Sequence, residues 1–90
     1  MTPPSPTLAF IGGGNMARSL IGGLIARGRP PASIHVSEPA QELREILARD
    51  FGVAVHADNL NAASAADIWV FAVKPQVLSA VCQALVAAAQ

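Results

Sequence analysis

An apolar run that stops at three consecutive glycines limits the folds open to this chain more than any other feature. Leu8-Ala9-Phe10-Ile11 is apolar throughout, and the glycines at 12–14 follow it directly. Continuous apolarity, rather than alternation, is typical of a parallel strand buried on both faces. Beyond the glycines, residues recur at helical spacing along one predicted stripe: Met16, Leu20, Gly23, Leu24 and Arg27, widened by Ile21 and Ile25. The chain therefore opens with a predicted strand, a tight turn and a helix.

The rest of the chain continues this alternation. Further strands are predicted at Ile34–Val36, Val53–Val55 and Ile68–Val73. Helices are predicted from Pro39, with Leu43, Ile46 and Leu47 inward, and from Pro75, with Leu78, Val81, Cys82 and Leu85 inward, and Asp58 or Asn59 could cap a short one. Strands alternating with helices build a parallel sheet covered on both sides. The predicted fold class is α/β, the N-terminal part of a Rossmann-like doubly wound parallel sheet over residues 8–90, after a flexible tail at 1–7.

Composition narrows the functional classes. The 90 residues make one domain at most, yet 52% are hydrophobic and only 13% charged. So short a chain places much of this apolar content near its surface, which we expect another part of a longer protein or a second subunit to cover. A net charge of zero and four aromatic residues argue against nucleic acid, and no apolar stretch is long enough for a membrane span. The single cysteine, Cys82, favours a reducing compartment, and we expect a cytoplasmic protein.

The glycine segment fits a pattern with a physical basis. Residues 12–17, Gly-Gly-Gly-Asn-Met-Ala, match G-x-G-x-x-[G/A]. Gly12 permits the tight turn, Gly14 lets a pyrophosphate approach the backbone, and Ala17 is small enough for close packing of helix on strand. The start of the helix then offers N–H donors to the anion. A strand before and a helix after the motif favour a dinucleotide site over a purely structural turn.

The end of the second predicted strand, Ser37-Glu38-Pro39, is where this fold meets the adenosine ribose. The Ser37 hydroxyl could donate to a 2′-phosphate, whereas Glu38 would accept from ribose hydroxyls and repel that phosphate. No Arg or Lys lies between Arg29 and Arg44, so we expect no local basic clamp. Glu38 equally suits a water-facing carboxylate at a helix start. The choice between the two cofactors stays open.

The only lysine, Lys74, ends the most apolar strand. Ligands of open α/β sheets bind beyond the carboxyl ends of the strands, so Ala72, Val73 and Lys74 are predicted to line the same crevice as the glycines. Lys74 equally suits a strand-end side chain that extends into solvent. Asn59, after the third strand, either caps a turn or bonds the adenosine end.

Two segments together resemble one family. Residues 10–17 followed by 20–24, and the segment Ala72-Val73-Lys74-Pro75-Gln76, are similar to the two signatures of pyrroline-5-carboxylate reductases. The resemblance implies a pyrophosphate site at Ile11, Gly12, Gly13, Gly14, Asn15 and Met16. It implies a ribose site at Ser37, Glu38 and Asn59, and a nicotinamide side at Ala72, Val73, Lys74 and Pro75. The implied reaction is hydride transfer from a reduced nicotinamide, in NADP with NAD as the alternative, to a cyclic imine, which gives L-proline.

The chain departs from the family in two respects. Glu38 stands where members often carry a small or hydroxyl residue, which argues against the family's usual preference for the phosphorylated cofactor. Members also continue with further strands and a C-terminal helical domain that forms the dimer and completes the substrate pocket. We therefore expect a truncated cofactor domain that is inactive alone and that reaches its homo-oligomer through the absent part. The alternatives are the cofactor domain of another Rossmann reductase, such as a deazaflavin-dependent oxidoreductase, or a non-catalytic nucleotide-binding module.

Other polar residues carry no predicted chemistry. His35 and His56 lie far apart in the sequence, with no Cys or acidic partner at ligand spacing, so we expect no metal site. No combination of nucleophile, base and orienting group is recognisable, so we assign no catalytic residue.

Overall fold

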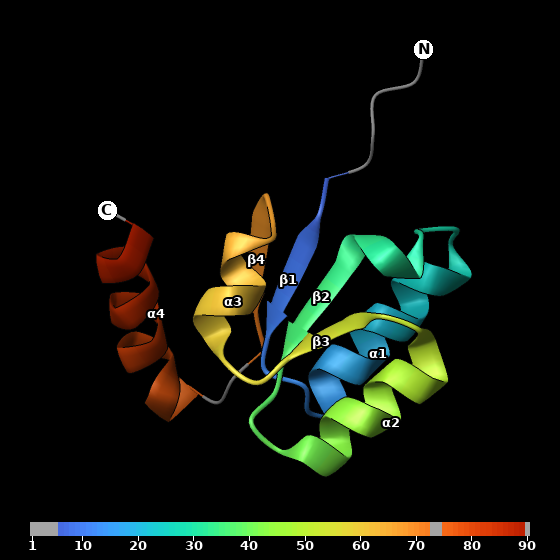
Figure 1. Ribbon diagram of the computed structural model, residues 1–90, viewed down its shortest axis with the longest axis horizontal. Coiled ribbons are helices and arrows are strands. Elements are labelled where there is room, and N and C mark those ends of the chain that lie inside the picture. The colour runs from blue at the N-terminus through green and yellow to red at the C-terminus, as the bar shows by residue number, and fades with distance from the viewer. Residues whose placement is uncertain (1–5, 73–74, 90) are drawn as a thin grey trace.

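A computed structural model describes residues 6–72 and 75–89, in which strands and helices alternate (Figure 1). The strands are β1 (Leu8–Ile11), β2 (Ile34–Ser37), β3 (Ala54–His56) and β4 (Ile68–Phe71). The helices are α1 (Asn15–Ala26), α2 (Gln41–Phe51), α3 (Asn59–Ser64) and α4 (Pro75–Ala89), with a 3-10 turn at Pro31–Ser33. The predicted order of elements is therefore present, apart from the unpredicted 3-10 turn before β2.

The strands of the described residues form one parallel sheet in the order β3-β2-β1-β4. Ile11, at the end of β1, pairs with Ser37 on one side and with Phe71 on the other. The chain runs outward from β1 to β3 and then crosses back to place β4 beside β1. This arrangement confirms the predicted Rossmann-like fold and puts the topological switch point between β1 and β4, where such sheets bind ligands.

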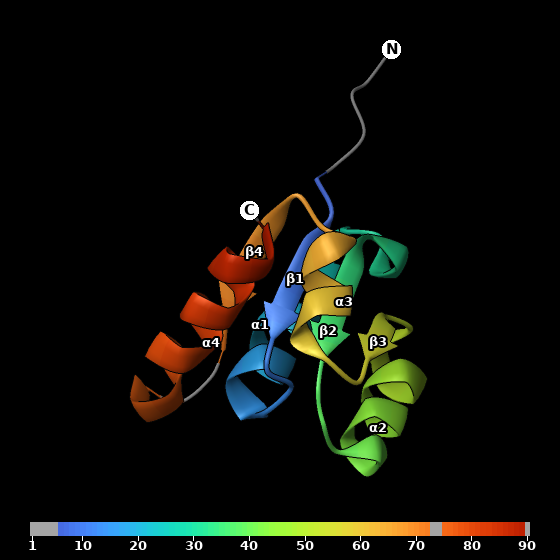
Figure 2. The same cartoon turned by 60° about the vertical axis from the view of Figure 1, so that its left-hand side comes forward.

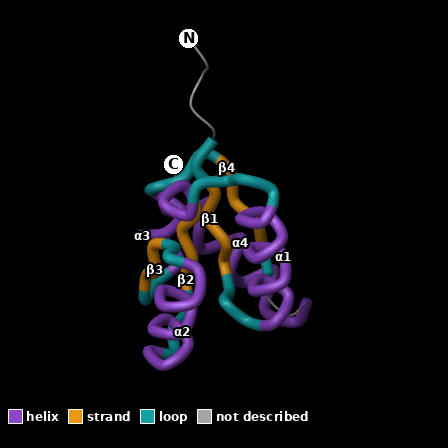
Figure 3. The backbone as a smooth tube through the Cα atoms, turned by 90° about the vertical axis from the view of Figure 1, so that its right-hand side faces the viewer, coloured by secondary structure: helices purple, strands orange, loops and turns teal. Residues whose placement is uncertain are grey.

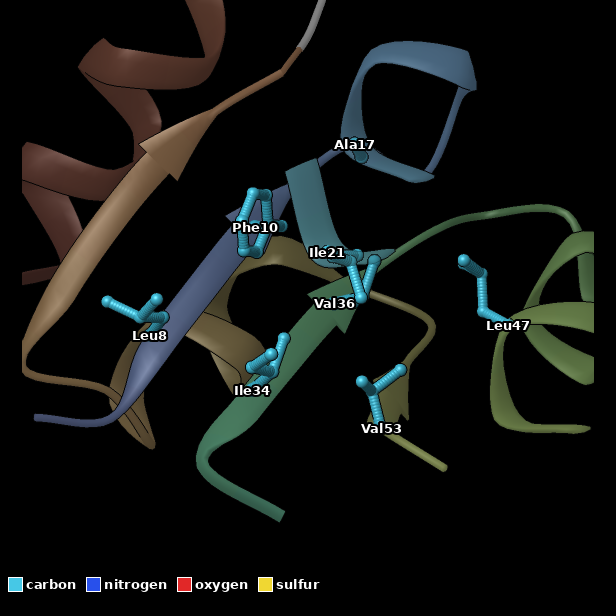
Figure 4. Packing of buried hydrophobic residues seen from close by; sticks show 8 residues of the cluster. All are labelled: Leu8, Phe10, Ala17, Ile21, Ile34, Val36, Leu47 and Val53. Atoms are coloured by element: carbon cyan, nitrogen blue, oxygen red, sulfur yellow. The ribbon is translucent and has the colours of Figure 1, made fainter. Parts of the chain in front are cut away.

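Helices flank the sheet, with α1 and α2 on one face and α3 and α4 on the other (Figures 1 and 3). Side chains alternate along each strand, so neighbouring residues of β1 enter different cores. Figure 4 shows the core under α1 and α2: Leu8, Phe10, Ala17, Ile21, Ile34, Val36, Leu47 and Val53. The opposite core joins Ile11 to Ala63 and Leu85. Burial on both faces explains why β1 is apolar without interruption.

The buried stripe of α1 differs from the predicted one. Met16 and Leu20 are 61% and 45% exposed, whereas Ala17 and Ile21 are fully buried. The small Ala17 is the residue that packs the start of the helix against the sheet, and this contact rotates the buried face by one position. Leu20 instead lines an apolar groove between α1 and β4, together with Leu8, Phe10, Gly23, Leu24 and Val70. Apolar side chains thus remain exposed, as the composition predicts.

The bounds of the other elements shift slightly from the predicted ones. α2 begins at Gln41 rather than at Pro39, because Ala40 keeps an extended conformation as the N-cap. Leu43 consequently lies exposed instead of inward. Gly52 ends α2 in the left-handed conformation, with a φ of 73°, which glycine adopts without strain. Within residues 6–72 and 75–89, no helix is long and apolar enough to cross a bilayer.

Candidate functional site

The glycine turn joins β1 to α1 at the carboxyl edge of the sheet. Gly12 has a φ of 109°, which side-chain-bearing residues rarely adopt, and its N–H donates to the carbonyl of Ser37 at 3.1 Å. Gly14 is the N-cap of α1, and no side chain among the described residues caps the helix. The first N–H groups of a helix have no acceptor within it and carry partial positive charge. The turn therefore presents donors suited to an anion.

Gly14 leaves the approach to these donors open. A Cβ built on Gly14 would have no heavy atom of residues 6–72 and 75–89 within 4 Å, and the φ of −77° at Gly14 is ordinary for any residue. Asn15 and Met16 are likewise exposed, while Ala17 is fully buried against the sheet. The residues present therefore fit the pyrophosphate of a dinucleotide, which needs an uncovered backbone at this turn.

At Gly13 the requirement for glycine is steric, because neighbouring side chains leave no room for a Cβ. A Cβ there would lie 3.0 Å from both Oε1 of Glu38 and Cδ1 of Leu47. Its backbone N–H donates to the same Glu38 Oε1 at 3.2 Å. The motif leaves this position unspecified, so the need for glycine at 13 comes from the neighbouring strand and helix and was not predicted.

Glu38 is buried, with only 8% of its surface exposed. One carboxylate oxygen accepts from the N–H of Gly13, and the other accepts from the N–H of Ala40 at 2.9 Å. The interpretation of Glu38 as a water-facing carboxylate at a helix start is therefore wrong, because the side chain turns inward and bonds two backbone donors. Glu38 ties the glycine turn to the loop between β2 and α2.

Ser37 and Asn59 meet beside Glu38. The buried Ser37 hydroxyl donates to Oδ1 of Asn59 at 2.5 Å. Asn59 is the first residue of α3, and the cap is Asp58, whose carboxylate accepts from the N–H of Asn61 at 2.8 Å. Figure 2 shows the starts of α1 and α3 and the loop after β2 at the same end of the sheet. The structure thus brings the predicted ribose-end residues together next to the glycine turn.

A basic side chain also lies at this end. Nη1 of Arg44, in α2, donates to the carbonyls of Glu38 at 2.8 Å and of Pro39 at 2.9 Å. The expectation of no local basic clamp considered only the residues between Arg29 and Arg44. The structure places Arg44 itself at this loop, because a helical residue can fold its long side chain back over the loop that precedes its helix.

The far side of the switch point is described in part. The N–H of Ala72 donates to the carbonyl of Ile11 at 2.9 Å, so Ala72 lies beside the glycine turn. Val73 and Lys74, predicted to line the nicotinamide side, lie outside the described residues. Pro75 is the first residue of α4.

Sequence reasoning missed a pair of histidines. Nδ1 of His35 lies 2.8 Å from Nε2 of His56, and the stacked rings have centroids 5.1 Å apart. Parallel pairing of β2 with β3 places them together despite the 21 residues between them. Burial, and then the neighbouring His56, lower the pKa of His35. Among the described residues, no group of three His, Cys, Asp or Glu side chains could hold a metal ion.

A glycine turn at the switch point of a 3-2-1-4 parallel sheet, with polar residues ending the neighbouring strands, defines a dinucleotide-binding domain. The sequence model of one family, described as NADP oxidoreductase, coenzyme F420-dependent, matches residues 7–90, and the chain belongs to this family. It is a family of nicotinamide-dinucleotide oxidoreductases.

Named relatives agree with the resemblance seen in the sequence. The chain is 52% identical over 81 residues to pyrroline-5-carboxylate reductase of Pseudomonas aeruginosa, covering 90% of the chain and 30% of that protein. It is 44% identical to that of Vibrio alginolyticus over 87% of the chain and 29% of the relative. A solved pyrroline-5-carboxylate reductase from Coxiella burnetii superimposes with a TM-score of 0.86 at 39% identity, covering 91% of this chain and 30% of that one. The chain thus spans about 30% of the length of these relatives.

Proposed function

We propose that this chain binds a reduced nicotinamide dinucleotide and is the cofactor-binding part of a pyrroline-5-carboxylate reductase. The observation that carries the proposal is the open backbone at Gly14, beside the assembled side chains of Ser37, Glu38 and Asn59. A relative that is 52% identical to the chain over the 81 aligned residues bears this name. The reaction of the whole enzyme would be hydride transfer to the carbon of a cyclic imine, which yields L-proline.

Each part of the site has a role in this proposal. The exposed N–H groups at the start of α1, at Asn15 and Met16, bind the pyrophosphate through backbone donors and the helix dipole. Ser37, Glu38 and Asn59 contact the adenosine ribose. Ala72, next to Ile11, lines the nicotinamide side together with the predicted residues 73–75.

The bound cofactor supplies the hydride, and the protein supplies binding and orientation. In this proposal the adenosine half of the dinucleotide binds on the β2 side of β1 and the nicotinamide half on the β4 side, which the strand order supports. Correct placement of the reacting carbon contributes a large part of the rate enhancement in such transfers.

The test is calorimetric titration of the 90-residue chain with NADH and NADPH, with AMP and nicotinamide mononucleotide as half-ligands. We expect at least one dinucleotide to bind more tightly than either half-ligand, because only the dinucleotide contains the pyrophosphate that α1 faces. Failure of both dinucleotides to bind would contradict the proposed function of this chain. Binding no tighter than that of AMP would show that the glycine turn does not hold the pyrophosphate.

A further inference from the structure

The loop between β2 and α2 carries a cation whose position is fixed. Nη1 of Arg44 donates to two successive carbonyls, those of Glu38 and Pro39, at 2.8 and 2.9 Å. The side chain is half-buried, so it does not extend freely into solvent. The guanidinium therefore stays on the loop that follows Ser37, at the ribose end of the proposed site.

The same guanidinium keeps further donors available. It carries five N–H donors in a planar fork, and the two carbonyls engage only Nη1. Within residues 6–72 and 75–89, Nε and Nη2 of Arg44 have no hydrogen-bond partner. A planar fork of this kind matches the oxygens of a phosphate, which it can bind through two parallel bonds.

Glu38 is the residue that would oppose a phosphate here. The residue, however, is only 8% exposed, and each oxygen of its carboxylate accepts from a backbone N–H, of Gly13 and of Ala40. These donors stabilise the negative charge and hold it inward, toward the glycine turn. The guanidinium of Arg44 is the half-buried charged group at this end of the site, and it still has N–H donors that the loop carbonyls do not use.

We propose that Arg44 recognises the 2′-phosphate of the cofactor, and that the chain consequently takes NADP(H) in preference to NAD(H). This inference rests on the proposed dinucleotide site. It assigns a specificity role to a residue outside both sequence signatures. The 2′-phosphate would replace water at Nε and Nη2 while Nη1 keeps its two carbonyl acceptors.

The test compares NADPH and NADH binding to the unaltered chain, Arg44→Gln and Arg49→Gln. Arg49 is a matched control, because it lies on the same helix, has a 74% exposed side chain and pairs with Asp50. We expect Arg44→Gln to weaken NADPH binding by about tenfold or more, and to leave NADH binding within about twofold, since only NADPH carries a phosphate at the 2′ position. Arg49→Gln should leave the ratio of the two affinities unchanged.

Two further measurements separate recognition from support of the loop. Arg44→Lys keeps the charge but loses the fork, so its preference for NADPH should lie between those of the unaltered chain and Arg44→Gln. Comparing the binding of adenosine 2′,5′-bisphosphate with that of AMP reports on the ribose end alone. Arg44→Gln should weaken binding of the bisphosphate and leave binding of AMP unchanged.

The outcomes that oppose the proposal are distinct. A preference of the unaltered chain for NADH would mean that the charge of Glu38 decides the selection. An equal loss of both cofactors in Arg44→Gln, with Arg44→Lys restoring both, would show that Arg44 only supports the loop. Binding of neither cofactor to the unaltered chain would contradict the proposed function itself, and this proposal with it.

Discussion

Glu38 and Gly13 are joined by a hydrogen bond across the ends of β2 and β1, with 3.2 Å between the carboxylate Oε1 and the backbone nitrogen. A second bond joins the N–H of Gly12 to the carbonyl of Ser37 at 3.1 Å. The glycine turn and the end of β2 are therefore held as one unit. A ligand that contacts both would find them already in position.

The first prediction concerns Gly13→Ala. The added methyl would lie 3.0 Å from Glu38 Oε1 and from Leu47 Cδ1, so the carboxylate or the leucine must move. We expect the free energy of unfolding to fall by about 1–3 kcal/mol, as overpacking of a buried site does. Urea denaturation followed by circular dichroism measures it.

Gly14→Ala is the control for this change. Its methyl would meet no heavy atom of the described part of the chain within 4 Å, and its backbone conformation suits alanine, so its stability should match that of the unaltered chain. If the two variants unfold at the same urea concentration, the contact between Gly13 and Glu38 is not tight in solution.

The second prediction concerns Glu38→Gln, which keeps the shape of the side chain but replaces one acceptor oxygen with a donor. The N–H of either Gly13 or Ala40 then loses its acceptor. An unsatisfied buried donor costs about 1–3 kcal/mol, and we expect a loss of that order in urea denaturation. Glu45→Gln, on the exposed face of α2, should change stability by less than about 0.5 kcal/mol. Equal effects of the two substitutions would argue against a structural role for the Glu38 carboxylate.

The sequence was sufficient for the order of elements and for the glycine turn, because both depend on local signals. The apolar run at Leu8–Ile11 and the glycine at 52 mark a strand and a helix end without reference to the rest of the chain. The φ of 109° at Gly12 agrees with the turn that the motif predicts. Local periodicity was less reliable for α1, where packing of Ala17 decided which face is buried.

Contacts between elements could not be predicted from the sequence, because they depend on strand register and side-chain direction. The inward turn of Glu38, the return of Arg44 over its loop and the pairing of His35 with His56 all join residues whose partners no local pattern specifies. The predicted roles of Val73 and Lys74 stay predictions, since these residues lie outside those that the structure describes.

The third prediction concerns Gly14→Val and the cofactor. The isopropyl group would occupy the open space in front of the first N–H groups of α1, where the pyrophosphate is proposed to bind. We expect affinity for the preferred dinucleotide to fall by at least about tenfold, equivalent to ~1.4 kcal/mol. Calorimetric titration measures the change. Gly23→Val is the matched control, because Gly23 also has open space around its Cβ position but lies farther along α1. Unchanged affinity in Gly14→Val would make the glycine turn a structural feature only.

The last prediction concerns pH and the histidine pair. Burial and the adjacent His56 lower the pKa of His35 from its ordinary value of 6.5, so the unfolded chain takes up a proton more readily than the folded one. The contribution of His35 to the free energy of unfolding is therefore fully present above about pH 6.5. It is lost as the pH falls toward the lowered pKa of the folded chain, at less than about 1.4 kcal/mol per pH unit.

His35→Gln should remove this dependence, because glutamine does not titrate and can still hydrogen-bond His56. Urea denaturation at about pH 7.5 and pH 5.5 should show a smaller loss of stability for the variant than for the unaltered chain. The carboxylates are common to both chains, so their titration cancels in this difference. An NMR titration of the His35 ring adds a direct reading of its pKa in the folded chain. Equal losses in both chains, with His35 titrating at its ordinary pH, would show that neither burial nor His56 perturbs His35 in solution.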